Sequence, residues 1–554
     1  MRIADAIIKT LSLNEVNYVF GIPSATFAGI LDALNDSDIE FIITKNEAGA
    51  TYCATKYSDL SNKLGVCMLA GGVGVNNAIN GIADAQRNKL PMLVINGDIK
   101  RSFMGKGALQ EFDNIKLLSS LTKYSKNILN EDEVIEEIEK AITIAMTPPC
   151  GPVALSIPFD IQNNEFKGIL PTNKIVIEAM QFDEKSLKEA INEINNTQKG
   201  LILVGRGSRG ISKEIKALSE KLKWPVMSTP NGKGIVHTDF PYYIGNYGFC
   251  SADGAVEYVE KEQFGCLLIL GSSLGQAATR DYNDILVKDR KVIRIDWDVA
   301  EFNKVFKEDI SVCCDLKQAV TLISNNVSVK ENPFIKPLMN KPYVKNHTGM
   351  SLRLFTEKIS DLLPADTCFV SDMGDFFNCL FKYMPIKETM DFQTSINYAC
   401  MGTGVGGVVG SYLANPDRTY AVMVGDGGFY MNGMEILTAK EYNIPIIYFV
   451  VNNSMLGLVN NGLNVLYGRS CKGKVKFAKK SIASIAEAMG VEAIQITSNE
   501  EVDNIKDLLH NRTQPLLIEL VTDGSEIVID TDRLQKVKSS PAESCADSKR
   551  MNLN

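Results

Sequence analysis

Residues 419–453 read TYAVMVGDGGFYMNGMEILTAKEYNIPIIYFVVNN, and this segment is the most informative in the chain. TYAVMV is an apolar, β-rich run that leads into GDG (425–427), and IPIIYFVV is a second such run that ends at NN (452–453). The segment between them, MNGMEILTAKEYN, has a helical pattern. We therefore predict a βαβ unit whose parallel strands both end in polar residues, at the edge where open α/β sheets bind ligands.

The residue types at these two strand ends predict a site for a metal ion and a diphosphate. Asp426 and Asn453 offer the hard oxygen ligands that Mg²⁺ prefers, and Mg²⁺ usually combines few protein ligands with phosphate oxygens. Gly427 and Gly428 allow the backbone to approach a diphosphate, and the N-terminus of the following helix favours an anion. A GDG alone usually marks a turn, but GDG followed after 24 residues by NN, each at a strand end, indicates a Mg²⁺-diphosphate site.

The rest of the chain predicts three domains of one fold class. A chain of 554 residues is too long for a single core. Short apolar runs alternate with helical stretches throughout, which favours parallel sheets with crossover helices and thus an α/β protein with three doubly wound parallel-sheet domains. Two linker-like stretches, 163–180 and 328–348, separate the blocks. We predict domains at 1–165, 180–328 and 349–530, followed by a polar tail at 531–554.

Composition excludes several classes of function. The net charge of -8 provides no basic surface for nucleic acid. No apolar run approaches the ~18 residues of a membrane span, and the first twenty residues do not resemble a signal peptide. The twelve cysteines form no C-x-x-C pair, so we expect reduced thiols and a cytoplasmic protein. Only three histidines are present, so any mechanism must manage proton transfer with very little imidazole.

The GDG and NN motifs resemble those of the thiamine-diphosphate enzyme family that includes acetolactate synthase, pyruvate oxidase and pyruvate decarboxylase. The resemblance implies pyrimidine-binding, central and diphosphate-binding domains, with Mg²⁺ held by Asp426, Asn453 and the carbonyl of Met455. NNSMLGLV is similar to the acetolactate synthase form of the second motif. The implied cofactor contacts in this part of the chain are Gly425, Asp426, Gly427, Gly428, Asn453, Met455, Leu456 and Gly457.

The resemblance also implies a catalytic carboxyl group. Thiamine diphosphate needs a carboxyl against its pyrimidine ring, because protonation of that ring promotes loss of the thiazolium C2 proton; a dry site that raises the carboxyl pKa would suit this role. Glu47 follows a predicted strand in FIITKNEAGATY and takes the place of the family's catalytic glutamate. Alone, a glutamate in a first helical turn is commonly a dipole partner. The chain departs from the family by Asn46 where histidine is frequent and by Ser24 where glycine is usual.

Two further segments extend the resemblance. SINYACMGTGVGG is similar to the family segment in which a methionine holds the cofactor in a bent form. The resemblance implies that Met401 is this methionine. It also implies that the carbonyl of Ala399 contacts the cofactor's 4′-amine. Methionine in such a place is otherwise most often core filler. SDMGDFFN, residues 371–378, resembles the loop beside the diphosphate, but its individual contacts are not predicted.

The reaction is less sharply defined than the cofactor. GALQEFDNI resembles an acetolactate synthase segment whose glutamine, here Gln110, lies near the substrate; Leu109 replaces an aromatic residue, and Gln110 could equally be a helix surface residue. No histidine lies near a cofactor motif, which disfavours a simple decarboxylase. FAD binding by the central domain is open: Gly205-Arg206-Gly207 follows a strand, but the RFDDR pattern of acetolactate synthase is absent.

We predict an acetolactate synthase-like lyase or carboligase that decarboxylates a 2-oxo acid and transfers the acyl unit to an acceptor. The family pairs the glutamate of one subunit with the diphosphate site of another, so the resemblance implies a homodimer or homotetramer. Three alternatives stay open: a flavin-dependent pyruvate oxidase, a non-oxidative 2-oxo acid decarboxylase, and a catalytically silent cofactor-binding subunit. No nucleic acid or membrane partner is expected.

Overall fold

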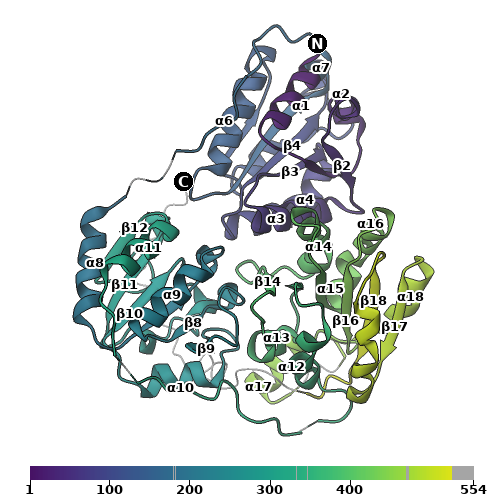
Figure 1. The fold of residues 1–554 in the computed structure, drawn as a ribbon. Helices are drawn as coiled ribbons and strands as arrows, with labels where there is room; N and C mark the ends of the chain where they lie inside the picture. The colour runs from purple at the N-terminus through teal and green to yellow at the C-terminus, as the bar shows by residue number, and fades with distance from the viewer. Residues whose placement is uncertain (179, 181, 332, 346, 470–472, 527–554) are drawn as a thin grey trace.

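The computed structural model describes residues 1–526 except 179, 181, 332, 346 and 470–472, so the predicted tail at 531–554 lies outside the described residues. The described chain contains three six-stranded sheets, and every strand pair in them is parallel (Figure 1). Helices cover the faces of the sheets. The predicted fold class, an α/β protein with three doubly wound parallel sheets, is confirmed.

The first sheet has the strand order β2-β1-β3-β4-β6-β5, which places a topological switch point between β1 and β3. Its strands β3, β4 and β6 are buried along their whole length, as expected for strands covered on both faces of a sheet, and GVCMLA in β3 is an example. The strands are β1 Tyr18–Gly21, β2 Glu40–Ile43, β3 Gly65–Ala70, β4 Met92–Asp98, β5 Tyr124–Asn127 and β6 Pro152–Pro158. The helices are α1 Ile3–Leu13, α2 Ala28–Ala33, α3 Glu47–Ser61, α4 Val73–Arg87, α5 Asn114–Leu118, α6 Val134–Met146 and α7 Phe159–Asn163.

The central sheet has the order β12-β11-β10-β7-β8-β9, which is the doubly wound order of dinucleotide-binding folds with its switch point between β7 and β10. Its strands are β7 Gly200–Val204, β8 Val226–Ser228, β9 Tyr243–Asn246, β10 Cys266–Leu270, β11 Lys291–Asp296 and β12 Ile310–Cys313. Its helices are α8 Glu184–Asn196, α9 Ser212–Leu222, α10 Asp253–Lys261 and α11 Leu316–Asn326.

The third sheet, β14-β13-β15-β16-β18-β17, repeats the strand order of the first sheet. The predicted strands of the opening segment are β15 and β16, so GDG and NN do end neighbouring parallel strands. The strands are β13 Cys368–Ser371, β14 Asp391–Thr394, β15 Tyr420–Gly425, β16 Ile447–Asn452, β17 Glu492–Ile496 and β18 Leu516–Val521. The helices are α12 Leu352–Leu362, α13 Phe377–Tyr383, α14 Thr403–Ala414, α15 Asp426–Asn432, α16 Ile436–Glu441, α17 Gly457–Tyr467, α18 Ile482–Ala488 and the 3₁₀ helix η11 Asn499–Leu509.

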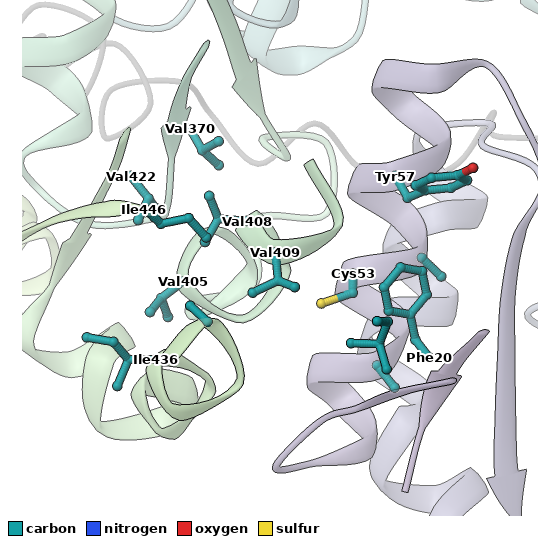
Figure 2. Packing of buried hydrophobic residues seen from close by; sticks show 14 of the residues in the cluster. Phe20, Cys53, Tyr57, Val370, Val405, Val408, Val409, Val422, Ile436 and Ile446 are labelled. Carbon is teal, nitrogen blue, oxygen red and sulfur yellow. The ribbon is translucent and has the colours of Figure 1, made fainter. Parts of the chain in front are cut away.

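The first and third sheets share one hydrophobic core because α3 packs directly against α14 (Figure 2). Figure 2 shows Cys53 of α3 facing Val405 and Val409 of α14. Four glycines in α14 make this close approach possible, although glycine costs about 1 kcal/mol each in a helix. A Cβ on Gly410 would lie 2.0 Å from the carbonyl oxygen of Cys53, so no larger residue fits there.

A buried ionic cluster joins all three sheets. Asp59 of α3 forms an ion pair of 2.7 Å with Arg206, which follows β7 in the central domain. Arg209 forms a second ion pair of 2.8 Å with Asp391 of β14. Burial raises the pKa of Asp59, but the charges of Arg209, Arg206 and Lys56 outweigh it and bring the pKa to about 2. The cluster therefore keeps Asp59 ionised where three domains meet.

The predicted domain boundaries (1–165, 180–328 and 349–530) stay a prediction. The three sheets themselves occupy residues 18–158, 200–313 and 368–521. In the described part of the chain, no helix combines the length and apolar character needed to cross a bilayer. The ten cysteines among the described residues are all free thiols.

Candidate active site

A cavity of about 380 Å³ opens at the carboxyl ends of β13, β15 and β16. It is bounded on one side by the first turn of α17 and on another by Phe249, Gln276 and Ala277 of the central domain. The cavity brings together every site residue predicted in the third domain. These residues are Ala399, Met401, Gly425, Asp426, Gly427, Gly428, Asn453, Met455, Leu456 and Gly457.

Asp426 provides a buried carboxylate oxygen in this cavity. Its Oδ1 accepts a hydrogen bond of 2.7 Å from the backbone N–H of Gly427, whereas its Oδ2 is buried and has no hydrogen-bond partner. Burial raises the pKa of Asp426 to about 6, and the nearby carboxylate of Asp375 adds to the effect. A buried oxygen that lacks a partner is costly unless a cation or donor satisfies it, so the residues present fit a Mg²⁺ ion.

Asn453 is oriented by its neighbours. Its Oδ1 accepts from the backbone N–H of Met455 at 3.1 Å, and its Nδ2 donates to Oδ2 of Asp375 at 3.0 Å. The turn at Asn453–Leu456 leads directly into α17, which starts at Gly457, and the residues of its first turn line the cavity. Such a helix start is suited to bind a phosphate group.

Asp375 is a site residue that was not predicted individually. A Cβ on Gly457 would lie 1.9 Å from its Oδ2, so the glycine is required for this carboxylate to reach Asn453. Burial raises the pKa of Asp375 above its usual range. An acidic residue shortly after an apolar strand, as in SDMGDFFN, was the available signal.

Asp372, also missed, fixes the turn that carries Met401. Its Oδ1 accepts from the N–H groups of Met373 and Gly402 at 2.6 and 2.7 Å. Its Oδ2 accepts from the N–H groups of Gly404 and Val405 at 2.8 and 3.1 Å. One buried carboxylate therefore ties the end of β13 to the start of α14 and holds the adjacent Met401 against the cavity.

The backbone at Ala399 and the small size of Gly427 both shape the wall of the cavity. Ala399 has φ 60°, a left-handed conformation that is uncommon for a residue with a side chain and often marks functional sites. A Cβ on Gly427 would lie 2.9 Å from Cε of Met401 and 3.0 Å from Cδ2 of Leu456. Gly427 therefore leaves room for both side chains at the wall of the cavity.

The two predicted catalytic residues of the first domain do not line this cavity. Glu47 is the first residue of α3, and its Oε2 accepts from Nδ2 of Asn77 at 3.0 Å. Gln110 has φ 65° and its carbonyl lies against Gly72 at the start of α4. The structure thus places Glu47 and Gln110 around the start of α4, apart from the cavity that contains Asp426.

Asn46, the departure from the family pattern, has a local structural role. It is the N-cap of α3, and its Oδ1 accepts from the N–H of Ala48 at 2.8 Å. Asparagine is among the most favourable N-cap residues, so the helix that carries Glu47 has a well-defined start.

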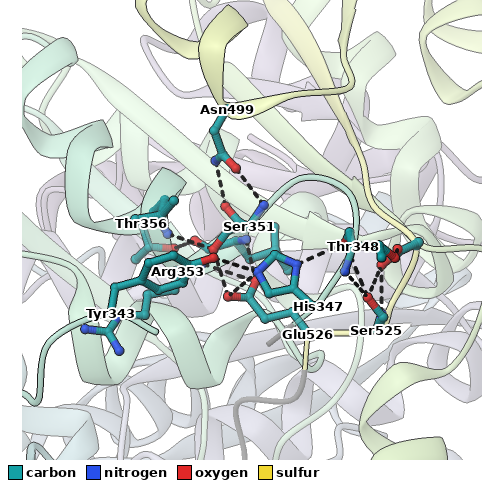
Figure 3. Close-up of polar contacts among 12 residues, drawn as sticks. Tyr343, His347, Thr348, Ser351, Arg353, Thr356, Asn499, Ser525 and Glu526 are labelled. Carbon is teal, nitrogen blue, oxygen red and sulfur yellow. Dashed lines mark hydrogen bonds and ion pairs between the residues drawn. The ribbon is translucent and has the colours of Figure 1, made fainter. Parts of the chain in front are cut away.

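None of the three histidines lines the cavity. Figure 3 shows His347 in a polar cluster with Ser351 and Glu526: its Nε2 accepts from Tyr343 Oη at 2.8 Å and its Nδ1 donates to the carbonyl of Thr348 at 2.9 Å. The nearby Glu526 accepts from Ser351 Oγ at 2.8 Å. The remaining two, His237 and His510, contact Lys216 and the carbonyl of Leu362.

The central domain's GRG segment serves packing and domain contacts. The N–H of Gly207 donates to the carbonyl of Gly271 at 2.9 Å, which joins the loops after β7 and β10 at the switch point. A Cβ on Gly205 would lie 2.3 Å from that same oxygen. Arg206 is also bound to Asp59 of the first domain, so the GRG segment makes contacts within the central domain and across to the first one.

Three family models match the chain. The model "Thiamine pyrophosphate enzyme, N-terminal TPP binding domain" matches residues 1–117, the central-domain model matches residues 187–323, and the "C-terminal TPP binding domain" model matches residues 372–520. Together they cover most of the chain, in the order that the three sheets follow. The chain belongs to the thiamine pyrophosphate enzyme family, and thiamine diphosphate is its cofactor.

The similar proteins narrow the resemblance to acetolactate synthases. The probable acetolactate synthase large subunit of Methanocaldococcus jannaschii is 29% identical over 95% of this chain and 93% of the relative. The acetolactate synthase large subunit of Lactococcus lactis is 28% identical, with the same coverage of both chains. The isozyme 2 large subunit of Escherichia coli is 27% identical over 95% of this chain and 97% of the relative. The predicted recognition as an acetolactate synthase-like enzyme is confirmed.

Proposed function

We propose that the enzyme decarboxylates a 2-oxo acid and transfers the remaining acyl unit to the carbonyl carbon of an acceptor, with thiamine diphosphate and Mg²⁺ bound in the cavity. The observation that carries the proposal is the buried, unpartnered Oδ2 of Asp426 in the same cavity as Asn453 and the first turn of α17. Thiamine diphosphate, when bound, supplies a carbon nucleophile and holds the electron pair that CO₂ leaves behind.

The residues of the third domain hold the cofactor's diphosphate end. Asp426, Asn453 and the carbonyl of Met455 bind the Mg²⁺ ion, while the backbone N–H groups at the start of α17 bind phosphate oxygens. Met401 and Ala399 line the same cavity, where the Met401 side chain would pack against the cofactor and the carbonyl of Ala399 would accept a hydrogen bond from its 4′-amine.

Glu47 holds the proton at the pyrimidine ring. Because Glu47 does not line the cavity of its own chain, we propose that it serves the cavity of a second copy, in a homodimer or homotetramer. Exposed apolar side chains near both half-sites support this arrangement, since they would otherwise remain in water. They are Val73, Leu109 and Phe112 in the first domain, and Tyr430, Met431, Met434 and Val459 in the third.

The cavity wall favours loss of CO₂ and an uncharged acceptor. Phe249, Phe377, Ile396 and Leu458 make it mainly apolar, and its lining in the described part of the chain includes no Lys, Arg or His. The carboxylate of a 2-oxo acid bound in this cavity would have no cationic partner, and this favours its loss as CO₂. For the same reason we propose an acceptor without a carboxylate, such as an aldehyde, placed near Gln276 and near Gln110 of the partner copy.

The test is incubation of the enzyme with thiamine diphosphate, Mg²⁺ and a panel of 2-oxo acids, alone and with added acetaldehyde or propanal, followed by mass spectrometry. We expect CO₂ release and a neutral 2-hydroxy ketone. A 2-hydroxy-2-acyl acid as main product would contradict the uncharged acceptor but not the carboligase.

The alternatives have distinct outcomes in the same experiment. Free aldehyde without ligation indicates a non-oxidative decarboxylase. Turnover that depends on an added oxidant, together with copurified flavin, indicates an oxidase. No CO₂ from any 2-oxo acid, despite bound cofactor, would refute the proposed activity and indicate a silent cofactor-binding subunit.

A further inference from the structure

Glu435 is a buried carboxylate that reaches from the third domain into the first. It ends the 3₁₀ helix η10 (Gly433–Glu435), which follows α15, and only 1% of its surface is exposed. Its Oε1 accepts from the backbone N–H groups of Lys45 and Asn46, both at 2.9 Å. Its Oε2 accepts from Thr438 Oγ1 at 2.9 Å. Both backbone donors immediately precede Glu47.

The first domain leaves space for the Glu435 carboxylate at Gly49. A Cβ on Gly49 would lie 2.2 Å from Oε1 of Glu435, so only glycine allows the contact. On the other side of the same turn, the Asn46 side chain caps α3 through Ala48. The first turn of α3 is thus held both by its own N-cap and by a carboxylate from another domain.

We propose that Glu435 is a positioning residue for Glu47: by fixing the N–H groups of Lys45 and Asn46, it sets where the Glu47 carboxyl stands. The proposal rests on the catalytic role of Glu47 proposed above. Glu435 belongs to the same domain as Asp426, because α15 and η10 are consecutive. If Glu47 serves a second copy, one rigid segment connects the metal-binding residues of one site to the carboxyl used in the other.

The contacts predict which substitutions matter. Both backbone bonds go to Oε1, so a glutamine with its carbonyl oxygen in that place keeps them, and its amide group faces Thr438 Oγ1. Methionine at position 435 has a similar length but accepts no hydrogen bond, so it leaves two buried N–H groups without a partner. Glu441 of α16 is a matched control, because it contacts Lys45 only through the side chain, in an ion pair of 2.5 Å, and is half-exposed.

The experiment compares Glu435→Gln, Glu435→Met and Glu441→Met. Backbone amide exchange of the 43–50 segment is measured by mass spectrometry on the cofactor-free protein. Exchange of the thiazolium C2 proton is then measured on the bound cofactor without substrate. We expect Glu435→Met to accelerate amide exchange and to slow C2 proton exchange, each by about tenfold or more. Glu435→Gln should stay within about twofold of wild type, as should Glu441→Met.

These readouts separate positioning from general stability and from the proposed reaction. Neither requires a 2-oxo acid, so they remain valid if the proposed activity fails. Wild-type C2 proton exchange in Glu435→Met would overturn the proposal, as would equal losses in Glu435→Gln and Glu435→Met. If Glu435→Met does not fold, Gly49→Ala provides the second approach, because its Cβ displaces the carboxylate; unchanged amide and C2 exchange there would equally overturn the proposal.

Discussion

Replacing Asp426 by Asn should stabilise the cofactor-free enzyme while removing its Mg²⁺ site. Burial raises the pKa of Asp426 from 3.8 to about 6, so the ionised form is destabilised in the folded protein. A shift of this size corresponds to about 3 kcal/mol between the two protonation states. Asparagine keeps an oxygen that can accept from Gly427 and carries no charge, so it should recover much of this free energy.

The pH dependence of the folding stability follows from the difference between the folded and unfolded pKa of Asp426. The folded pKa exceeds the unfolded one, so the folded state binds more protons between pH 3.8 and about 6 and loses stability as the pH rises through this window. The stabilisation by Asp426→Asn should therefore be about 3 kcal/mol at pH 7.5 and about half of that at pH 5.0. For a domain of this size, the larger value corresponds to a rise in Tm of roughly 6–12 °C.

Thermal melts of proteins purified without cofactor, at pH 5.0 and 7.5, measure the change in stability. The same melts after addition of Mg²⁺ and thiamine diphosphate measure the loss of the Mg²⁺ site. Wild type should gain Tm from the cofactor and the ion, whereas Asp426→Asn should gain little. The exposed Asp417, just before β15, supplies the control Asp417→Asn, which should behave as wild type. An equal Tm of Asp426→Asn and wild type at pH 7.5, or an undiminished cofactor response in the variant, would refute the reasoning.

Three further predictions concern other parts of the site. Glu47→Gln should abolish C2 proton exchange while Mg²⁺-dependent cofactor binding, measured by calorimetry, persists; near-normal turnover would contradict the assigned acid. Gly410→Ala should destabilise the protein by about 3 kcal/mol in denaturant titrations, because its Cβ would meet the Cys53 carbonyl at 2.0 Å, and wild-type stability would refute the close helix packing. Asp372→Asn should lower the Tm and weaken cofactor binding, since an amide can accept only part of the four N–H bonds; unchanged cofactor affinity would count against its role in holding the Met401 turn.

The diphosphate half of the site was predictable because its signals are local. GDG and NN each directly follow an apolar strand, and parallel neighbouring strands bring their carboxyl ends to one edge. Asp426 and Asn453 therefore fall into one cavity wherever this βαβ unit forms. The identical strand orders of the first and third sheets were not predicted, because they depend on how distant strands pair.

The missed residues act through contacts between distant segments. Asp372 is recognisable only when β13 and the start of α14 lie together, and Glu435 only when the end of η10 meets the start of α3. Neither has a spacing that distinguishes it from an ordinary acidic residue. Asn46 was noted as a substitution for histidine, but its function as an N-cap required the observed end of α3.

The cluster around Asp59 limits how this enzyme can be rebuilt from parts. Its carboxylate belongs to the first domain, yet Arg206, which neutralises it, comes from the central one. A graft of the central domain from a relative that lacks arginines at positions 206 and 209 would remove the two central-domain charges that keep Asp59 ionised, and breaking a buried ion pair in this way costs about 3–5 kcal/mol. Chimeras should therefore exchange the first and central domains together, so that both residues of the ion pair come from the same protein.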